Sequence, residues 1–404
     1  MISKLMLKNT LLFSFILLFS CGNSAKPKVE SQKLKVENIE TKLEFKTGAD
    51  NFELYLPLLK NKKVGIVTNQ SGILTTKTHL VDFLLTEKVN IQKIYAPEHG
   101  FRGTADAGEV IKDGKDIKTG LPIISLYGNN KKPKPEQLEG IGIMVFDLQD
   151  VGARFYTYIS SLHYVMEACA ENNIPLIVLD RPNPNGGIVD GPILEKEFTS
   201  FVGMHQIPVL HGMTIGEYAK MINGEKWLKN EIQCKLTVVP CENYNRTMFY
   251  DLLVKPSPNL PNAQAINLYA SLCFFEGTNV SVGRGTEKQF QVYGSPFLNK
   301  GDFSFTPQPN EGAKDPTYNG KICYGEDLTQ IKPVNKLELK WLIKAYNETT
   351  DKSKFFNAFF TKLAGTKKLQ EQIEKGISET EIRASWQKGL IDFKEMRKSY
   401  LIYE

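Results

Sequence analysis

The chain has 404 residues, of which 41% are hydrophobic and 24% are charged, and its formal net charge at pH 7 is +5. This length and composition are typical of a globular protein with two or three domains and exclude an intrinsically disordered chain. The small positive excess, with no run of Lys and Arg between aromatic residues, gives no indication of a nucleic-acid partner.

Residues 1–20 have the form of a secretory signal peptide. Lys4 and Lys8 precede an apolar run that is too short to span a bilayer. The sequence Leu-Phe-Ser-Cys at 18–21 resembles a bacterial lipobox, which implies cleavage before Cys21 and acylation of its thiol. The alternative is an ordinary signal peptide with an incidental cysteine. Residues 21–48 are polar and are interpreted as a lipid-anchored flexible tether, so we expect a cell-envelope lipoprotein that is anchored to a membrane and faces the periplasm.

Beyond the tether, short apolar runs alternate with segments of helical spacing. Strands are predicted to begin at residue 64 and to cover 91–96, 121–127, 141–147, 174–179 and 235–239. Helices are predicted over 78–88, around 159–169 and from about 214. This alternation indicates an α/β fold with a Rossmann-like parallel sheet and helices on both faces. No glycine fingerprint for a dinucleotide or a triphosphate follows the first strand, so no cofactor is predicted.

Polar side chains follow three of these strands, and the carboxyl ends of parallel strands share one edge of a sheet. Glu98 and His99 follow the strand over 91–96. Asp150, Arg154 and Tyr156 follow the strand over 141–147, which itself ends in Asp147. The strand over 174–179 is followed by Asp180, Arg181 and Asn183. Because Glu98 and His99 are both proton-transfer groups, this edge is predicted to carry a catalytic site.

Each of these residues also has a structural interpretation. Glu98 could cap a helix and His99 could satisfy a buried carbonyl group. Asp150 could cap a turn, with Arg154 as its ion-pair partner. The Pro-Asn-Gly run after Asp180 could be only a stiff loop. His163 lies near the apolar stripe of its helix and is interpreted as a core histidine. His205 and His211 have no carboxylate partner at ligand spacing, so no metal site is predicted.

A Pro-rich segment at 256–261 is interpreted as a domain boundary. It separates a Rossmann-like catalytic domain over 49–255 from a smaller α+β domain over 256–404. The segment 268–275 is compatible with a helix or a strand. It runs into a polar, glycine-rich loop that contains Glu276, Asn279 and Arg284, and amphipathic helices are predicted from about 337 onward.

Five motifs together resemble the bacterial exo-β-N-acetylmuramidase family, long catalogued as a domain of unknown function. They are Pro-Glu-His-Gly-Phe-Arg-Gly at 97–103, the segment 147–158, Asp-Arg-Pro-Asn-Pro at 180–184, Pro-Ser-Pro-Asn at 256–259 and the loop 276–286. The resemblance covers nearly everything from residue 52 onward. It implies an active site in the cleft between the two domains and removal of terminal, non-reducing N-acetylmuramic acid from peptidoglycan fragments. The family's implicated catalytic glutamate corresponds to Glu98.

Glycoside hydrolysis needs an acid for the leaving oxygen and a second group at the anomeric carbon. Glu98 is the predicted acid. The second group is left open among Asp147, Asp150, Asp180, Glu276 and the acetamido oxygen of the substrate. The lactyl carboxylate of N-acetylmuramic acid suits a guanidinium, and the candidates are Arg102, Arg154 and Arg284.

Two other functions use the same features of the sequence. A lipid-anchored protein could bind a muropeptide or a sugar in the same cleft without cleaving it, and it would need no proton donor at the glycosidic oxygen. A Rossmann oxidoreductase is disfavoured by the missing glycine fingerprint. The expected partners are therefore muramic-acid-terminated saccharides and, through Cys21, a membrane.

Overall fold

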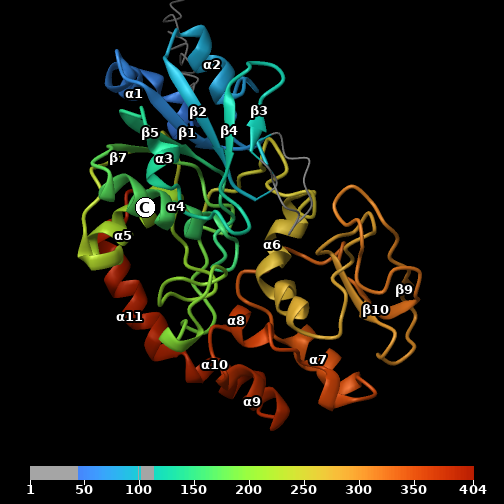
Figure 1. Ribbon diagram of the computed structural model, residues 1–404. Helices are drawn as coiled ribbons and strands as arrows, with labels where there is room; N and C mark the ends of the chain where they lie inside the picture. The colour runs from blue at the N-terminus through green and yellow to red at the C-terminus, as the bar shows by residue number, and fades with distance from the viewer. Residues whose placement is uncertain (1–43, 99, 102–112) are drawn as a thin grey trace, which may run out of the picture. The chain divides into compact units, whose positions relative to one another are not determined.

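The computed structural model describes residues 44–98, 100, 101 and 113–404, which belong to one compact unit. Among the described residues, one sheet has seven strands in the order β3 (Gly114–Lys115), β4 (Pro122–Ser125), β2 (Ile91–Ala96), β1 (Val64–Thr68), β5 (Ile143–Asp147), β6 (Leu176–Leu179) and β7 (Leu236–Val239) (Figure 1). Neighbouring strands are parallel except for β3, which pairs antiparallel with β4. The predicted Rossmann-like sheet is confirmed, and the short antiparallel edge strand was not predicted.

The order of the six parallel strands places the first strand in the middle of the sheet. When these six strands are numbered one to six in chain order, their order across the sheet is three, two, one, four, five, six. Doubly wound dinucleotide-binding domains have the same strand order. In such sheets ligands bind where the winding reverses, here beyond β1 and β5. In this chain the loops at that point bond to each other. Asn69 accepts hydrogen bonds from the Ser71 backbone and hydroxyl groups, and the Gln149 backbone N–H donates to that hydroxyl.

Helices cover both faces of the sheet, as predicted. Alternate strand residues enter two separate hydrophobic cores, so that Ile66 and Val145 lie in one and Val67 and Phe146 in the other. The first core is completed by α1 (Phe52–Leu59) and α2 (Leu80–Thr86). The second is completed by α4 (Tyr158–Glu171) and α5 (Ile215–Gly224), while the short α3 (Pro135–Leu138) precedes β5.

The C-terminal part contains α6 (Ala263–Leu272) and an antiparallel sheet in the order β8 (Val292–Ser295), β10 (Cys323–Asp327), β9 (Ser304–Phe305). Its later helices are α7 (Lys340–Glu348), α8 (Phe360–Ala364), α9 (Lys368–Glu374), α10 (Glu379–Ser385) and α11 (Gln387–Arg397). The predicted smaller α+β domain is thus confirmed. It shares the second core with the sheet, and the boundary at 255/256 stays a prediction.

The ambiguous segment around 268 is helical because α6 has a strong start signal. The Asn262 side chain accepts a hydrogen bond from the Ala265 backbone N–H at 2.9 Å, which satisfies an otherwise unpaired donor of the first turn. Within the described ranges, no helix has the length and apolar character that crossing a bilayer requires.

A buried ion pair joins the ends of β5 and β6. Arg181 donates from Nε to Asp147 Oδ1 at 2.5 Å and from Nη2 to Oδ2 at 2.9 Å, and Nη2 also donates to the Ile73 carbonyl. The Asp147 side chain is fully buried, and that of Arg181 is 4% exposed. Burial alone would lower the pKa of Arg181, but the adjacent Asp147 charge raises it. The pair therefore fixes the carboxyl edge of the sheet.

We expect Asp147→Asn to lower the free energy of unfolding by roughly 3–5 kcal/mol, because it leaves the Arg181 charge buried without a counter-charge. Urea denaturation followed by circular dichroism measures this loss. Asp82→Asn is the matched control, since Asp82 pairs with the exposed Lys118 and its loss should cost below about 1 kcal/mol. Equal stability of the Asp147 and Asp82 variants would contradict the structural role of Asp147.

Candidate active site

A pocket of about 230 Å³ lies between the carboxyl ends of the strands and the C-terminal part. Its polar walls are formed by Glu98, Tyr127, Tyr156, Thr157, Ser257, Asn259, Tyr269, Glu276 and Arg284. Its apolar walls include Phe155, Phe201, Leu260, Phe290, Phe359 and Leu363. The volume is below the roughly 300–1,000 Å³ of pockets that hold drug-sized ligands, so the pocket suits a small polar molecule with one apolar face.

Both carboxyl oxygens of Glu98 are held by hydroxyl groups. The Tyr127 hydroxyl donates to Oε1 at 3.0 Å, and the Thr157 hydroxyl donates to Oε2 at 3.0 Å. Glu98 and Tyr127 each lie two residues beyond the end of a strand, β2 and β4. Because these strands are neighbours in the sheet, the two side chains meet. Thr157 is the residue before α4.

The loop that carries Thr157 is rigidly held. Asp150 Oδ2 accepts a hydrogen bond from the Gly152 backbone at 2.7 Å. Gly152 has φ +78°, and a Cβ there would lie 2.2 Å from Asn183 Oδ1, so both the conformation and the close approach require glycine. Tyr156 donates its hydroxyl to the Pro256 carbonyl at 2.8 Å, which ties the loop to the Pro-rich segment.

Arg154 joins this loop to other segments of the chain through its guanidinium group. Its guanidinium is 1% exposed and donates to four backbone carbonyl groups, at Pro192, Ile207, Leu363 and Ala364. Burial lowers its pKa to about 9. The side chain joins segments that are about 200 residues apart in the sequence, and it does not line the pocket.

Glu276 and Arg284 form an ion pair in the pocket wall that the C-terminal part supplies. Arg284 Nε donates to Glu276 Oε1 at 2.7 Å, and Nη2 lies 2.7 Å from the same oxygen. The two side chains remain 26% and 24% exposed. Burial alone would lower the pKa of Arg284, but the Glu276 charge raises it.

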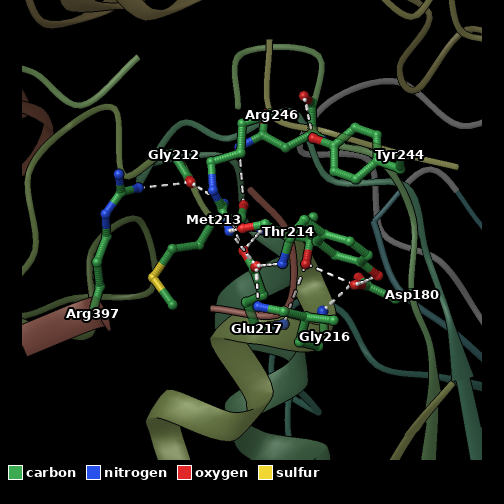
Figure 2. Close-up of polar contacts among 12 residues, drawn as sticks. Asp180, Gly212, Met213, Thr214, Gly216, Glu217, Tyr244, Arg246 and Arg397 are labelled. Atoms are coloured by element: carbon green, nitrogen blue, oxygen red, sulfur yellow. Dashed lines mark hydrogen bonds and ion pairs between the residues drawn. The ribbon is translucent and has the colours of Figure 1, made fainter. Parts of the chain in front are cut away.

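Asp180 lies away from the pocket, in the network of Figure 2. It accepts hydrogen bonds from the Thr214 hydroxyl at 2.7 Å, the Gly216 backbone at 2.7 Å and the Tyr403 hydroxyl at 2.6 Å. The carboxylate thus lies at the N-terminus of α5 and also binds the end of the chain. Burial raises its pKa to about 6.

Several other sequence-predicted residues also lie outside the pocket lining. Arg181 is paired with Asp147, Asn183 donates to the Met213 carbonyl, and Asn279 donates to the Thr349 hydroxyl. His99 and Arg102 lie outside the described residues, as does Cys21. The structure therefore brings Glu98, Tyr156, Glu276 and Arg284 of the predicted set together.

Asp150 is buried beside His211, and its Oδ2 lies 3.8 Å from His211 Nε2. Burial raises the pKa of Asp150 to about 7, and burial lowers the pKa of His211 to about 3, so both groups favour their neutral forms. Neither lines the pocket. The described residues contain no group of three or more His, Cys, Asp or Glu side chains placed to share a metal ion.

Tyr127 and Thr157 were not among the predicted site residues, although both contact Glu98. Tyr127 carried a usable signal, because it ends the predicted strand over 121–127, and Glu98 follows the neighbouring strand at the same edge of the sheet. Phe290 and Tyr269 gave no comparable signal, since aromatic residues are common in any core.

Comparisons with known proteins agree over both parts of the chain. Two family models match, described as the N-terminal part of exo-beta-N-acetylmuramidase NamZ over residues 64–264 and the C-terminal part over residues 267–403. The peptidoglycan beta-N-acetylmuramidase NamZ of Bacillus subtilis (strain 168) is 39% identical over 406 residues, which cover 94% of this chain and 95% of that protein.

Two crystal structures of DUF1343 family proteins from Bacteroides fragilis NCTC 9343 have the same fold. They superpose with TM-scores of 0.83 and 0.75 at 43% and 30% sequence identity. Each comparison covers 89% of this chain and 99% of the other chain.

We expect Asp150→Asn to change the pH dependence of stability. Folded Asp150 retains its proton up to about pH 7, whereas the unfolded chain releases it near pH 4, so the wild type loses stability as pH rises through this window. The asparagine of the variant does not titrate, so the variant does not lose stability for this reason. Its unfolding free energy relative to the wild type should therefore rise by roughly 1–4 kcal/mol between pH 5 and pH 8.

Denaturant titrations at the two pH values measure this difference. Asp392→Asn is the control, because Asp392 is 60% exposed and pairs with Lys388 on the surface. Parallel pH profiles for the wild type and Asp150→Asn would show that Asp150 is ionised in the folded protein at neutral pH.

Proposed function

This chain belongs to the NamZ family of exo-β-N-acetylmuramidases, and on that premise we propose that it releases terminal, non-reducing N-acetylmuramic acid from peptidoglycan fragments with Glu98 as general acid and base. Family membership makes the protein a glycosidase that acts on peptidoglycan, and the interpretation as a non-catalytic sugar-binding protein is set aside for that reason.

The observation that supports the role of Glu98 is the chemistry of its partners Tyr127 and Thr157 among the described residues. The hydroxyls of Tyr127 and Thr157 hold one carboxyl oxygen each. A hydroxyl can donate to a carboxylate and can also accept from a protonated carboxyl group, whereas a guanidinium or a backbone N–H only donates. These two hydroxyl contacts can therefore persist when Glu98 loses and regains its proton, as the contacts of a general acid that later acts as a base must do.

The pocket around Glu98 supports cleavage at the end of a saccharide. It has the volume for a small ligand, and the rings of Phe155, Tyr156 and Tyr269 form part of its wall. Aromatic rings pack against the apolar face of a pyranose and exclude water from the reacting bond. A pocket of this size suits one terminal sugar better than a groove that accepts a chain along its length.

The lining of the pocket supports one carboxyl candidate for the second catalytic group over the other three. Of the four carboxyl candidates, Glu276 lines the pocket, whereas Asp147, Asp150 and Asp180 are buried elsewhere. The acetamido oxygen of the substrate is the other candidate that remains. For the lactyl carboxylate, Arg154 is occupied by backbone carbonyl groups, and Arg102 stays a prediction outside the described residues.

We expect Glu98→Gln to lower kcat for a muramic-acid-terminated disaccharide by about 10²–10⁴-fold, because the amide cannot deliver a proton. Substrate binding should stay within a few-fold, since the amide preserves the shape of the side chain. An aryl muraminide with a good leaving group should partly recover the activity, because such a group departs without protonation. Release of free sugar and of aryl alcohol measures the two rates.

Glu136→Gln, at an exposed position of α3, is the matched control and should retain wild-type activity. Equal losses on the disaccharide and the aryl substrate would remove Glu98 from the acid role. Wild-type turnover of the disaccharide by Glu98→Gln would remove it from catalysis altogether.

We also propose that Cys21 carries a lipid that anchors the protein to a membrane on its periplasmic side. The support is the apolar run over 11–20 and the lipobox-like sequence that follows. A bacterial lipoprotein cysteine supplies more than one acyl chain, as stable anchoring requires.

Cys21→Ala should move the protein from the membrane fraction to the soluble fraction, with the activity of the folded domain unchanged. Fractionation with detection by antibody measures the distribution. Cys234→Ala, which alters a buried cysteine far along the chain, is the control and should leave the protein with the membranes. Continued sedimentation of the Cys21 variant with membranes would refute lipid anchoring at this residue.

A further inference from the structure

The Glu276–Arg284 pair in the pocket wall has unused hydrogen-bonding capacity. Two of the Arg284 nitrogens, Nε and Nη2, are directed at the same Glu276 oxygen, Oε1. The other oxygen, Oε2, has as its contact the Cys273 thiol at 3.6 Å, which is a weak donor. Arg284 Nη1 donates to no group in the described part of the chain. The pair therefore offers a ligand one charged acceptor and one charged donor.

A residue in contact with the pair, Phe290, has a strained backbone conformation. Phe290 is buried with φ +53°, which is an outlier for a bulky residue. Its ring lies 5.1 Å below the Arg284 guanidinium and packs edge-on against Tyr269 at 5.0 Å. Strain of this kind persists where the surrounding structure enforces it, and it is concentrated at binding sites.

The two glycines that flank Arg284 show the same constraint. Gly283 and Gly285 have φ +77° and +80°. A Cβ at Gly283 would lie 2.6 Å from Val292 Cγ2, and one at Gly285 would lie 2.6 Å from the Gln308 carbonyl oxygen. These two positions therefore require glycine, and the close contacts hold the loop backbone on both sides of Arg284.

The ligand chemistry that matches one donor and one acceptor is an alcohol. A sugar hydroxyl donates one hydrogen bond and accepts another, so it can satisfy Glu276 and Arg284 together. A carboxylate only accepts, and it would lie beside the negative charge of Glu276. The pair thus favours a hydroxyl of the sugar over the lactyl carboxylate as its ligand.

In N-acetylmuramic acid the 3-oxygen is an ether and has no hydrogen to donate. The 4-hydroxyl is free at a chain end, but inside a chain it carries the next sugar. It also lies across the pyranose ring from the glycosidic bond, and Glu98 and Glu276 enter the pocket from different parts of the chain. We infer that the Glu276–Arg284 pair binds the free 4-hydroxyl of the terminal sugar and thereby restricts cleavage to chain ends. This inference rests on the proposed function. A Glu276 carboxylate bound to the 4-hydroxyl does not reach the anomeric carbon, so of the two remaining candidates for the second catalytic group it leaves the acetamido oxygen of the substrate.

The test combines enzyme variants with modified substrates. The wild-type enzyme is assayed with an aryl β-N-acetylmuraminide and with the 4-deoxy and 6-deoxy analogues of this substrate. The 4-deoxy analogue should lose about 10²-fold or more in kcat/KM, because it leaves charged partners unpaired. In Glu276→Gln and Arg284→Lys, which weaken the same contact, this penalty should fall below about tenfold. Glu326→Gln, which alters an exposed pair with Lys344, should retain the full penalty.

A 4-deoxy penalty that is unchanged in both pocket variants would overturn the inference, as would coupling to the 6-hydroxyl in place of the 4-hydroxyl. Calorimetric binding of N-acetylmuramic acid and its 4-deoxy form gives the same comparison without turnover. The aryl leaving group also separates this result from the role of Glu98. Failure of Glu98→Gln to lose activity would refute the acid assignment, and it would leave the hydroxyl coupling measurable.

Discussion

The orientation of the Glu98 carboxyl group is the constraint on which the site depends. Glu98 is proposed to protonate the glycosidic oxygen, and for this its carboxyl group must point in one direction. Two hydroxyls from two different loops each hold one of its oxygens. Tyr127 reaches Glu98 because β2 and β4 are neighbouring parallel strands. Thr157 reaches it because the loop after β5 is held by Arg154 through four carbonyl groups. The C-terminal part supplies two of those carbonyls, so the same contacts that join the two parts of the chain also position Glu98.

Most other polar residues at the sheet edge stabilise the fold. Strand ends deliver carboxylates close to helix N-termini, where unpaired backbone N–H groups and the helix dipole favour negative charge. Asp180 occupies such a position at α5 and also anchors Tyr403 from the end of the chain. Asp147 balances the buried charge of Arg181. A cluster of polar residues at this edge is therefore expected in many α/β proteins, and it identifies a catalytic site only where the side chains also reach a pocket.

The sequence was sufficient for the sheet and for part of the site. Continuous apolar runs located the parallel strands, and the strand break before Glu98 placed it at the edge. Local pattern could not give the strand order, which puts β1 between β2 and β5, or the contact of Tyr403 with Asp180, 223 residues away. It also could not separate Arg154 from Arg284. Both are arginines in glycine-containing loops. Only the fold shows that Arg154 donates its hydrogen bonds to backbone carbonyl groups, whereas Arg284 stays partly exposed in the pocket.

The most direct test of the account is a crystal structure of the Glu98→Gln variant with an uncleaved disaccharide that has N-acetylmuramic acid at its non-reducing end. We expect this sugar in the pocket, with its glycosidic oxygen about 2.6–3.2 Å from the substituted side chain. Its free 4-hydroxyl should lie within hydrogen-bond distance of Glu276 and Arg284. A sugar bound outside the pocket, or one bound with its reducing end toward Glu276, would contradict the account.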